Sequence, residues 1–108
     1  MYDFTYHRPA SIEDAAKLLA AKPDAKPMSG GMSLLPSMKL RLSHWSDIVD
    51  LAGIPNLSGI REEKDHIIIG ARTRHYDVAT SELLHAKLPA LAQLAEGIGD
   101  PLVRNRGT

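Results

Sequence analysis

Residues 29–36 read Ser29-Gly30-Gly31-Met32-Ser33-Leu34-Leu35-Pro36, which sets two glycines and a hydroxyl between a short apolar segment and an apolar segment of helical spacing. Glycines lack a Cβ, so they adopt positive φ angles, turn successive N–H groups toward one point and let a ligand approach the main chain. Ser33 occupies the expected N-cap of a helix. The stretch therefore predicts a phosphate or pyrophosphate cradle made of main-chain amides at a helix N-terminus.

Other motifs built on glycine and serine do not fit this stretch. A G-x-S-x-G nucleophile elbow needs a glycine two residues after the serine, where this chain has Leu35. The stretch contains neither the Gly-Lys-Ser/Thr of a Walker A loop nor the G-x-G-x-x-G of a Rossmann fold. An ordinary turn without a ligand stays open, because Gly-Gly pairs also serve hairpins and helix ends.

The composition excludes several classes of protein. The 108 residues contain 13 basic and 13 acidic side chains with no long run of either sign, which argues against nucleic-acid binding and a membrane-surface patch. The sequence has neither an 18-residue apolar stretch nor a signal peptide, so we expect a cytoplasmic protein without membrane insertion. Because the chain has no cysteine, any redox role requires a bound organic cofactor.

The first half of the chain predicts a small β-α-β lobe over residues 1–56. Its expected elements are strands at 4–7, 26–29 and 47–51, a helix that Ser11 caps, and a helix over 34–41. Pro36 is compatible with the second helix because it falls in the first turn. The turn-rich residues 53–56 mark the boundary to a second lobe.

The second half, residues 57–108, predicts the beginning of a second lobe with an antiparallel sheet, so the fold class is α+β. Residues 57–62 and 66–70 are expected to form a hairpin with a three-residue loop. Thr73 is expected to cap a short helix, and Pro89 to stand at N1 of a longer one. The tail, residues 100–108, has no expected strand or helix cap.

No residue is nominated as a catalytic group or a metal ligand. The five histidines lack the i, i+4 spacing and the nearby carboxylate of familiar metal sites, so we assign them surface or packing roles; they are His7, His44, His66, His75 and His85.

Three segments in this order resemble the FAD-binding medium subunit of the molybdenum hydroxylases, the family of the carbon monoxide dehydrogenase and xanthine dehydrogenase flavin subunits. They are residues 29–42 (SGGMSLLPSMKLRL), 69–73 (IGART) and 98–108 (IGDPLVRNRGT). The resemblance implies FAD as cofactor and a fold similar to that of p-cresol methylhydroxylase and vanillyl-alcohol oxidase, in which the flavin lies between two lobes. Chemistry would then belong to the isoalloxazine of FAD.

The resemblance also implies which residues contact FAD. In the family, an Ala-Gly-Gly-x-Ser loop holds the pyrophosphate through amides and a hydroxyl, and this chain matches it with Ser29 in place of alanine. Thr108 matches the first residue of the family's second motif, Thr-Ile-Gly-Gly-Asn. The expected FAD contacts are Ser29, Gly30, Gly31, Met32, Ser33, Leu34 and Thr108.

For the whole protein, the resemblance implies an oxidoreductase subunit. This chain would be its N-terminal part and would be inactive by itself. Its partners would be a molybdopterin-binding large subunit and an iron–sulfur small subunit. Electrons would pass from the iron–sulfur clusters through FAD to an external acceptor.

Two alternatives stay open from the sequence. One is an FAD-dependent reductase of cell-wall precursors, whose similar loop usually has asparagine after the serine, where this chain has Leu34. The other is a non-enzymatic α/β interaction module in which the loop is only a turn. The colour of the full-length subunit distinguishes these alternatives: a flavoprotein is yellow, and the interaction module is colourless.

Overall fold

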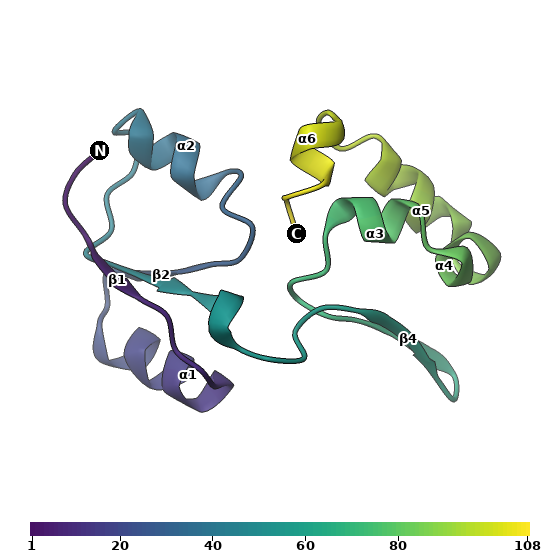
Figure 1. The fold of residues 1–108 in the computed structure, drawn as a ribbon, viewed down its shortest axis with the longest axis horizontal. Coiled ribbons are helices and arrows are strands. Elements are labelled where there is room, and N and C mark those ends of the chain that lie inside the picture. The colour runs from purple at the N-terminus through teal and green to yellow at the C-terminus, as the bar shows by residue number, and fades with distance from the viewer. The chain divides into compact units, whose positions relative to one another are not determined.

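The computed structural model describes residues 1–108, which divide into two compact units, Met1–Pro55 and Asn56–Thr108 (Figure 1). The first unit contains three strands, two α-helices and one 3-10 helix. They are β1 (Thr5–His7), α1 (Ile12–Ala21), β2 (Ala25–Met28), α2 (Leu34–Lys39), β3 (Asp47–Asp50) and η1 (Leu51–Gly53).

The three strands of the first unit form a parallel sheet in the order β1-β3-β2. Thr5 and Ala25 both pair with Asp47, so β3 lies between the other two strands. The expected β-α-β start is present, because β1, α1 and β2 follow one another and both strands run parallel to β3, but β3 separates the two strands in the sheet. Pro27 fits in β2 because that strand lies at an edge of this sheet, where a missing N–H is tolerated. All four residues of β3 are buried, which makes this strand the centre of the unit.

Local capping sets the start of α1, as the sequence predicts. The Ser11 hydroxyl accepts a hydrogen bond from the Asp14 N–H at 3.1 Å, and Glu13 and Asp14 place negative charge in the first turn. The helix packs on β2 and β3, and Ala15 is its buried residue.

The end of α2 differs from the prediction, which extended the helix to residue 41. Arg41 adopts a left-handed φ of 57°, and the Arg41 and Leu42 N–H groups donate to the Met38 and Ser37 carbonyls at 3.0 and 2.8 Å. This pair of hydrogen bonds is a Schellman motif, which usually has glycine at the left-handed position. Arginine there costs roughly 1 kcal/mol relative to glycine. Leu42, which follows the left-handed residue, is 77% exposed.

A buried carboxylate joins three parts of the first unit. Asp47 is 4% exposed, and its Oδ1 lies 2.6 Å from Nε2 of His7 in β1 and 3.1 Å from Nζ of Lys22, the C-cap of α1. The Ser46 hydroxyl donates to Oδ2 at 2.7 Å. The hydrogen bond from His7 is the main cause that lowers the pKa of Asp47 from 3.8 to about 2, and the Ser46 and Lys22 bonds add to it.

This pKa shift predicts an acid-dependent part of the stability. A carboxyl whose pKa is lower in the folded protein stabilises the fold above its unfolded pKa of 3.8 and stops doing so as the pH falls to about 2. We expect Asp47→Asn to lower the free energy of unfolding most above pH 3.8, and the difference from wild type to shrink toward pH 2. Urea unfolding of both proteins across this range measures it. A difference independent of pH would contradict the role of the charge.

The second unit begins with an antiparallel hairpin and continues with four helices (Figure 1). Its elements are β4 (Ile60–Glu63), β5 (His66–Ile69), α3 (His75–Ala79), α4 (Glu82–Lys87), α5 (Pro89–Glu96) and α6 (Pro101–Arg104). The hairpin loop has two residues, because Glu63 pairs with His66. The prediction of a three-residue loop was wrong by one residue. The left-handed φ of 47° at Lys64 allows the tighter turn.

Helices α3, α4 and α5 of the second unit surround one apolar cluster. Its buried members are Val78, Ala79, Leu84, Ala92 and Ala95, with Ile60, Ile67 and Leu91 packed against them. The sheet and the helices therefore share a core, and α5 contacts both α3 and α4. As predicted, Pro89 is the first residue of α5.

Three predictions for this unit are corrected. Thr73 does not cap a helix, since its hydroxyl bonds to both the N–H and the carbonyl of Gly59 at 3.0 and 3.1 Å. Helix α4 was not predicted, although Ser81 caps it by accepting from the Leu84 N–H. The tail forms α6, which Asp100 caps by accepting from the Val103 N–H at 2.9 Å. Each cap satisfies an N–H that has no partner inside its helix.

The helices described here include none with the length and apolar character of a membrane span.

Candidate functional site

The glycine loop lies at the carboxyl ends of the strands of the parallel sheet. Ser29 follows Met28, the last residue of β2, and Met28 pairs with Asp50, the last residue of β3. Ligands of open α/β sheets bind beyond the carboxyl ends of the strands. The loop predicted to bind phosphate therefore lies beyond the carboxyl ends of the strands, where a ligand is expected.

Gly31 is the residue of the loop whose backbone requires glycine. Its φ is +79°, and a Cβ added there would lie 3.0 Å from Cδ1 of Leu35 and 3.4 Å from Sδ of Met28. Its carbonyl accepts the Leu35 N–H at 3.0 Å. Because L side chains rarely adopt this φ and the Leu35 and Met28 side chains would have to shift, any other residue would strain the loop.

The start of α2 differs from the predicted cradle in two respects. Ser33 has helical backbone angles and makes no side-chain capping hydrogen bond. The helix is only six residues long and has Pro36, which lacks an N–H, at its third position. Its dipole is therefore small, so an anion would be held mainly by main-chain N–H groups that follow Gly31 and by the Ser33 hydroxyl, which makes no capping bond.

A tyrosine–aspartate pair near the same edge of the sheet was missed from the sequence. The Tyr6 hydroxyl donates to Oδ2 of Asp50 at 2.6 Å, and Oδ1 accepts the Ala52 N–H at 2.9 Å, which caps η1. The hydrogen bond to Asp50 raises the pKa of Tyr6. Both Asp50 oxygens are thus engaged within the unit. An aspartate directly before a short turn was the only sequence signal for this pair.

The second matching segment, residues 69–73, holds the hairpin to the chain before it. A Cβ on Gly70 would overlap the Leu57 carbonyl oxygen, and the Gly70 and Arg72 N–H groups donate to Gly59 and Leu57 at 2.9 and 2.7 Å. Nε of Arg72 is buried without a partner and is thus a donor to which sequence reasoning assigned no role. In this segment the backbone of residues 70–72 therefore packs directly against the backbone of residues 57–59.

The third matching segment ends beside the start of α3. The Gly107 carbonyl accepts the His75 N–H at 2.9 Å, and the Gly107 N–H donates to Val103 at 2.7 Å. Nη1 of Arg104 donates to the Ile98 and Gly99 carbonyls, both at 3.1 Å. These bonds hold Thr108, the predicted FAD contact of the second unit, next to α3.

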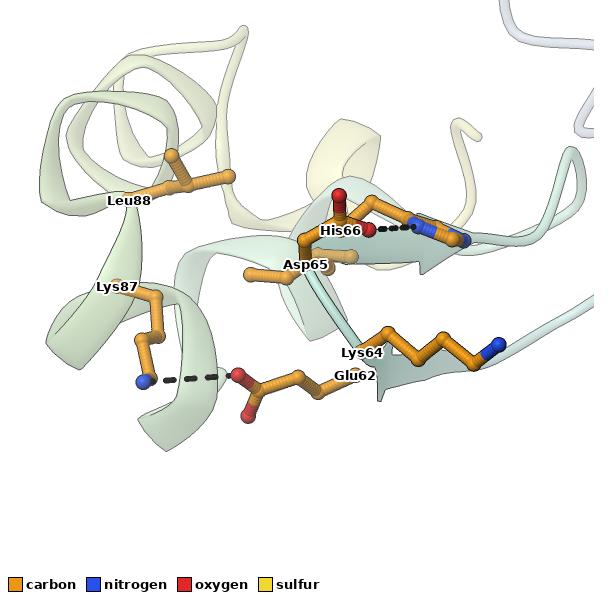
Figure 2. A pocket seen from close by; sticks show the side chains of 7 residues that line it. Glu62, Lys64, Asp65, His66, Lys87 and Leu88 are labelled. Atoms are coloured by element: carbon orange, nitrogen blue, oxygen red, sulfur yellow. Dashed lines mark hydrogen bonds and ion pairs between the residues drawn. The ribbon is translucent and has the colours of Figure 1, made fainter.

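Two pockets lie within the second unit. Thr108 lines an apolar one of about 290 Å³ together with residues of β5, α3 and α5. The other, about 390 Å³, lies between the hairpin tip and the end of α4. Figure 2 shows Lys87 directed at Glu62, with an Nζ–Oε1 distance of 3.5 Å, and His66 paired with Asp65. Its two lysines, Lys64 and Lys87, are balanced by Glu62 and Asp65, so this pocket offers no excess positive charge to a phosphate.

The structure thus places Ser29 to Leu34, the loop and the first residue of α2, in the first unit and Thr108 in the second. No group of three or more histidine or acidic side chains that could hold a metal ion is found in residues 1–108.

Comparison with known proteins identifies relatives of this chain. The family described as "FAD binding domain in molybdopterin dehydrogenase" matches residues 2–108. The carbon monoxide dehydrogenase medium chain of Hydrogenophaga pseudoflava is 48% identical over 106 residues, which cover 97% of this chain and 37% of that protein. The xanthine dehydrogenase FAD-binding subunit of Escherichia coli O157:H7 is 34% identical, over 100% of this chain and 38% of the relative.

Solved structures agree with this result. The carbon monoxide dehydrogenase from Hydrogenophaga pseudoflava that lacks the Mo-pyranopterin moiety superimposes with a TM-score of 0.94 at 47% identity, covering 99% of this chain and 38% of that one. Quinoline 2-oxidoreductase from Pseudomonas putida 86 gives 0.92 at 34% identity, with coverages of 99% and 38%. The chain therefore spans a little over a third of the relatives that it matches.

Proposed function

The chain belongs to the family of FAD-binding domains of molybdopterin dehydrogenases, and from this premise we propose that it holds the FAD diphosphate on the loop from Ser29 to Leu34. The observation that carries the proposal is Gly31, whose φ of +79° is one that L side chains rarely adopt and whose added Cβ would lie 3.0 Å from Leu35 Cδ1. Such a loop matches a diphosphate, which is recognised by main-chain N–H groups at close approach.

The residues of the loop would divide the binding between them. Gly30 and Gly31 would let the diphosphate approach the backbone, Met32 and Leu34 would contribute main-chain amides, and the Ser33 hydroxyl would donate to a phosphate oxygen. Thr108 would contact FAD from the second unit. Ser29 replaces the alanine of the family loop.

For the whole protein we propose the FAD-binding medium subunit of a molybdenum-containing hydroxylase or dehydrogenase, with the two-lobed fold of p-cresol methylhydroxylase. Relatives are named medium chains or subunits of carbon monoxide, glyceraldehyde and xanthine dehydrogenases, which supports large molybdopterin-binding and small iron–sulfur partners. When bound, FAD would supply the redox chemistry that links partner iron–sulfur clusters to an external acceptor. No side chain of this chain is proposed as an acid, base or nucleophile.

The proposal is tested on the full-length subunit assembled with its partners. We expect the apo-subunit to bind FAD on titration, and the flavin absorbance of the anaerobic complex to bleach when substrate reduces the partners. A complex that lacks the iron–sulfur subunit is the control, in which the flavin should stay oxidised. A flavin that stays oxidised in the complete complex, while its iron–sulfur clusters are reduced, would contradict the proposed electron path.

A further inference from the structure

Two side chains from the residues that flank the glycine loop fill the space beside Gly31. A Cβ added to Gly31 would lie 3.0 Å from Cδ1 and 3.3 Å from Cγ of Leu35, and 3.4 Å from Sδ of Met28. Carbon atoms in favourable contact are about 3.5–4.0 Å apart. Leu35 therefore occupies part of the space that a side chain at Gly31 would need, and Met28 borders it.

The two side chains come from different elements of the first unit. Met28 is the last residue of β2 and Leu35 is the second residue of α2, and both are partly buried. The Leu35 N–H also donates to the Gly31 carbonyl at 3.0 Å. Since all three residues belong to the first unit, these contacts are made within the unit itself. They hold the loop against the strand before it and the helix after it.

Helix α2, which carries Leu35, is fixed independently of the loop. Its Met38 side chain is only 2% exposed. The Ser37 hydroxyl donates to the Leu34 carbonyl at 2.9 Å and lies 2.7 Å from the Ser43 hydroxyl. The helix can therefore serve as the fixed side of the contact with Gly31.

A glycine loop needs such a contact if it is to keep one conformation. Glycine has more backbone freedom than any other residue, and this loop has two in succession. A binding site that is already ordered loses less conformational freedom when its ligand binds. Packing that restrains Gly31 should therefore strengthen binding without touching the ligand.

We propose that Leu35, assisted by Met28, is a positioning residue of the FAD site. Its side chain holds Gly31 at a φ of +79° and thereby keeps the main-chain N–H groups that follow Gly31 in the arrangement that binds the diphosphate. Leu35 was not among the residues expected to contact FAD, and it acts through Gly31. This inference rests on the proposed function, in that the ligand of the loop is taken to be FAD.

The test compares Leu35→Ala with Leu19→Ala in the full-length subunit. Leu19 is also a partly buried helical leucine of the first unit, but it lies in α1 and is not among the neighbours nearest to Gly31. Both variants lose the same apolar atoms, so both should lower the Tm of the apo-subunit by about 2–8 °C. Only Leu35→Ala should also raise the Kd for FAD, by about tenfold or more, in titrations at a temperature where both variants are folded. Leu35→Met, which nearly conserves the volume, should keep the Kd within about threefold of wild type.

A second measurement does not involve FAD. Gly31→Ala should lower the Tm of the apo-subunit by about 2–4 °C, because of the positive φ and the approach to Leu35. In the Leu35→Ala background, Cγ and Cδ1 are absent and only the cost of the φ remains. The same substitution should then lower the Tm by at least about 1 °C less than in wild type, because the two residues are in contact.

Three results would overturn the inference. One is a wild-type Kd for FAD in Leu35→Ala while Gly31→Val loses FAD, which would leave the proposed function intact. Another is an equal rise of the Kd in Leu35→Ala and Leu19→Ala, which would assign the effect to general destabilisation. The third is the same Tm loss from Gly31→Ala in both backgrounds. Failure of the proposed function is distinct from all three, since the wild-type subunit itself would then not bind FAD.

Discussion

Replacing Gly31 with valine is expected to abolish FAD retention by the full-length subunit. The residue has a φ of +79°, which a β-branched side chain hardly adopts, and an added Cβ would lie 3.0 Å from Leu35 Cδ1 before the two methyl groups are counted. Strain of this kind is about 1–3 kcal/mol, and its relief moves the amides that would bind the diphosphate. We expect FAD affinity to fall by about a hundredfold or more in titrations of the apo-subunit.

Gly59→Val is the matched control for this experiment. Gly59 also has a positive φ, of +129°, but an added Cβ would meet nothing within 4 Å, and the residue lies in the second unit before β4. It therefore carries backbone strain without changing the loop. Ser33→Ala, which removes one hydrogen bond to a charged group, should weaken FAD binding by about ten- to a hundredfold. Equal FAD affinity in wild type and Gly31→Val would refute the assignment of the loop.

The second large effect is expected at Gly70, and it concerns folding. An alanine Cβ there would overlap the Leu57 carbonyl oxygen and lie 2.8 Å from its carbon, both parts of the backbone. To relieve the overlap, the two backbone segments must move apart, which lengthens the hydrogen bonds from Gly70 to Gly59 and from Arg72 to Leu57. Steric overlap costs about 1–3 kcal/mol and each lost hydrogen bond about 1 kcal/mol, so we expect Gly70→Ala to lower the free energy of unfolding by about 3 kcal/mol.

Urea unfolding of the full-length subunit measures this loss. Gly97→Ala is the control, because Gly97 has a negative φ of −86° and the nearest atom to its added Cβ is the Leu94 oxygen at 3.6 Å. That variant should be neutral or more stable by up to about 1 kcal/mol. If both alanine variants unfold alike, the close backbone approach at Gly70 does not limit the stability.

The elements that sequence patterns predict correctly are those set by neighbours along the chain. The Ser11 cap of α1, Pro89 at the start of α5 and the antiparallel hairpin were all predicted. A turn at the glycine pair was also predicted, and the left-handed φ of Gly31 agrees with it; that its amides hold a phosphate stays a prediction. In each case the signal and the structure that it specifies lie within a few residues, where caps, fixed proline angles and the absence of a Cβ act directly.

Long-range contacts decide the features that sequence patterns did not predict. Strand β3 pairs with β1 on one side and with β2 on the other, and no local pattern encodes that order. Thr73 was expected to cap a helix, but it bonds to Gly59, 14 residues away. Serine and threonine hydroxyls bond to whichever backbone group the fold brings near, so their type predicts a capability and the tertiary structure selects the partner. Likewise, an exposed arginine at the left-handed end of α2 is visible only once the helix end and its neighbours are placed in space.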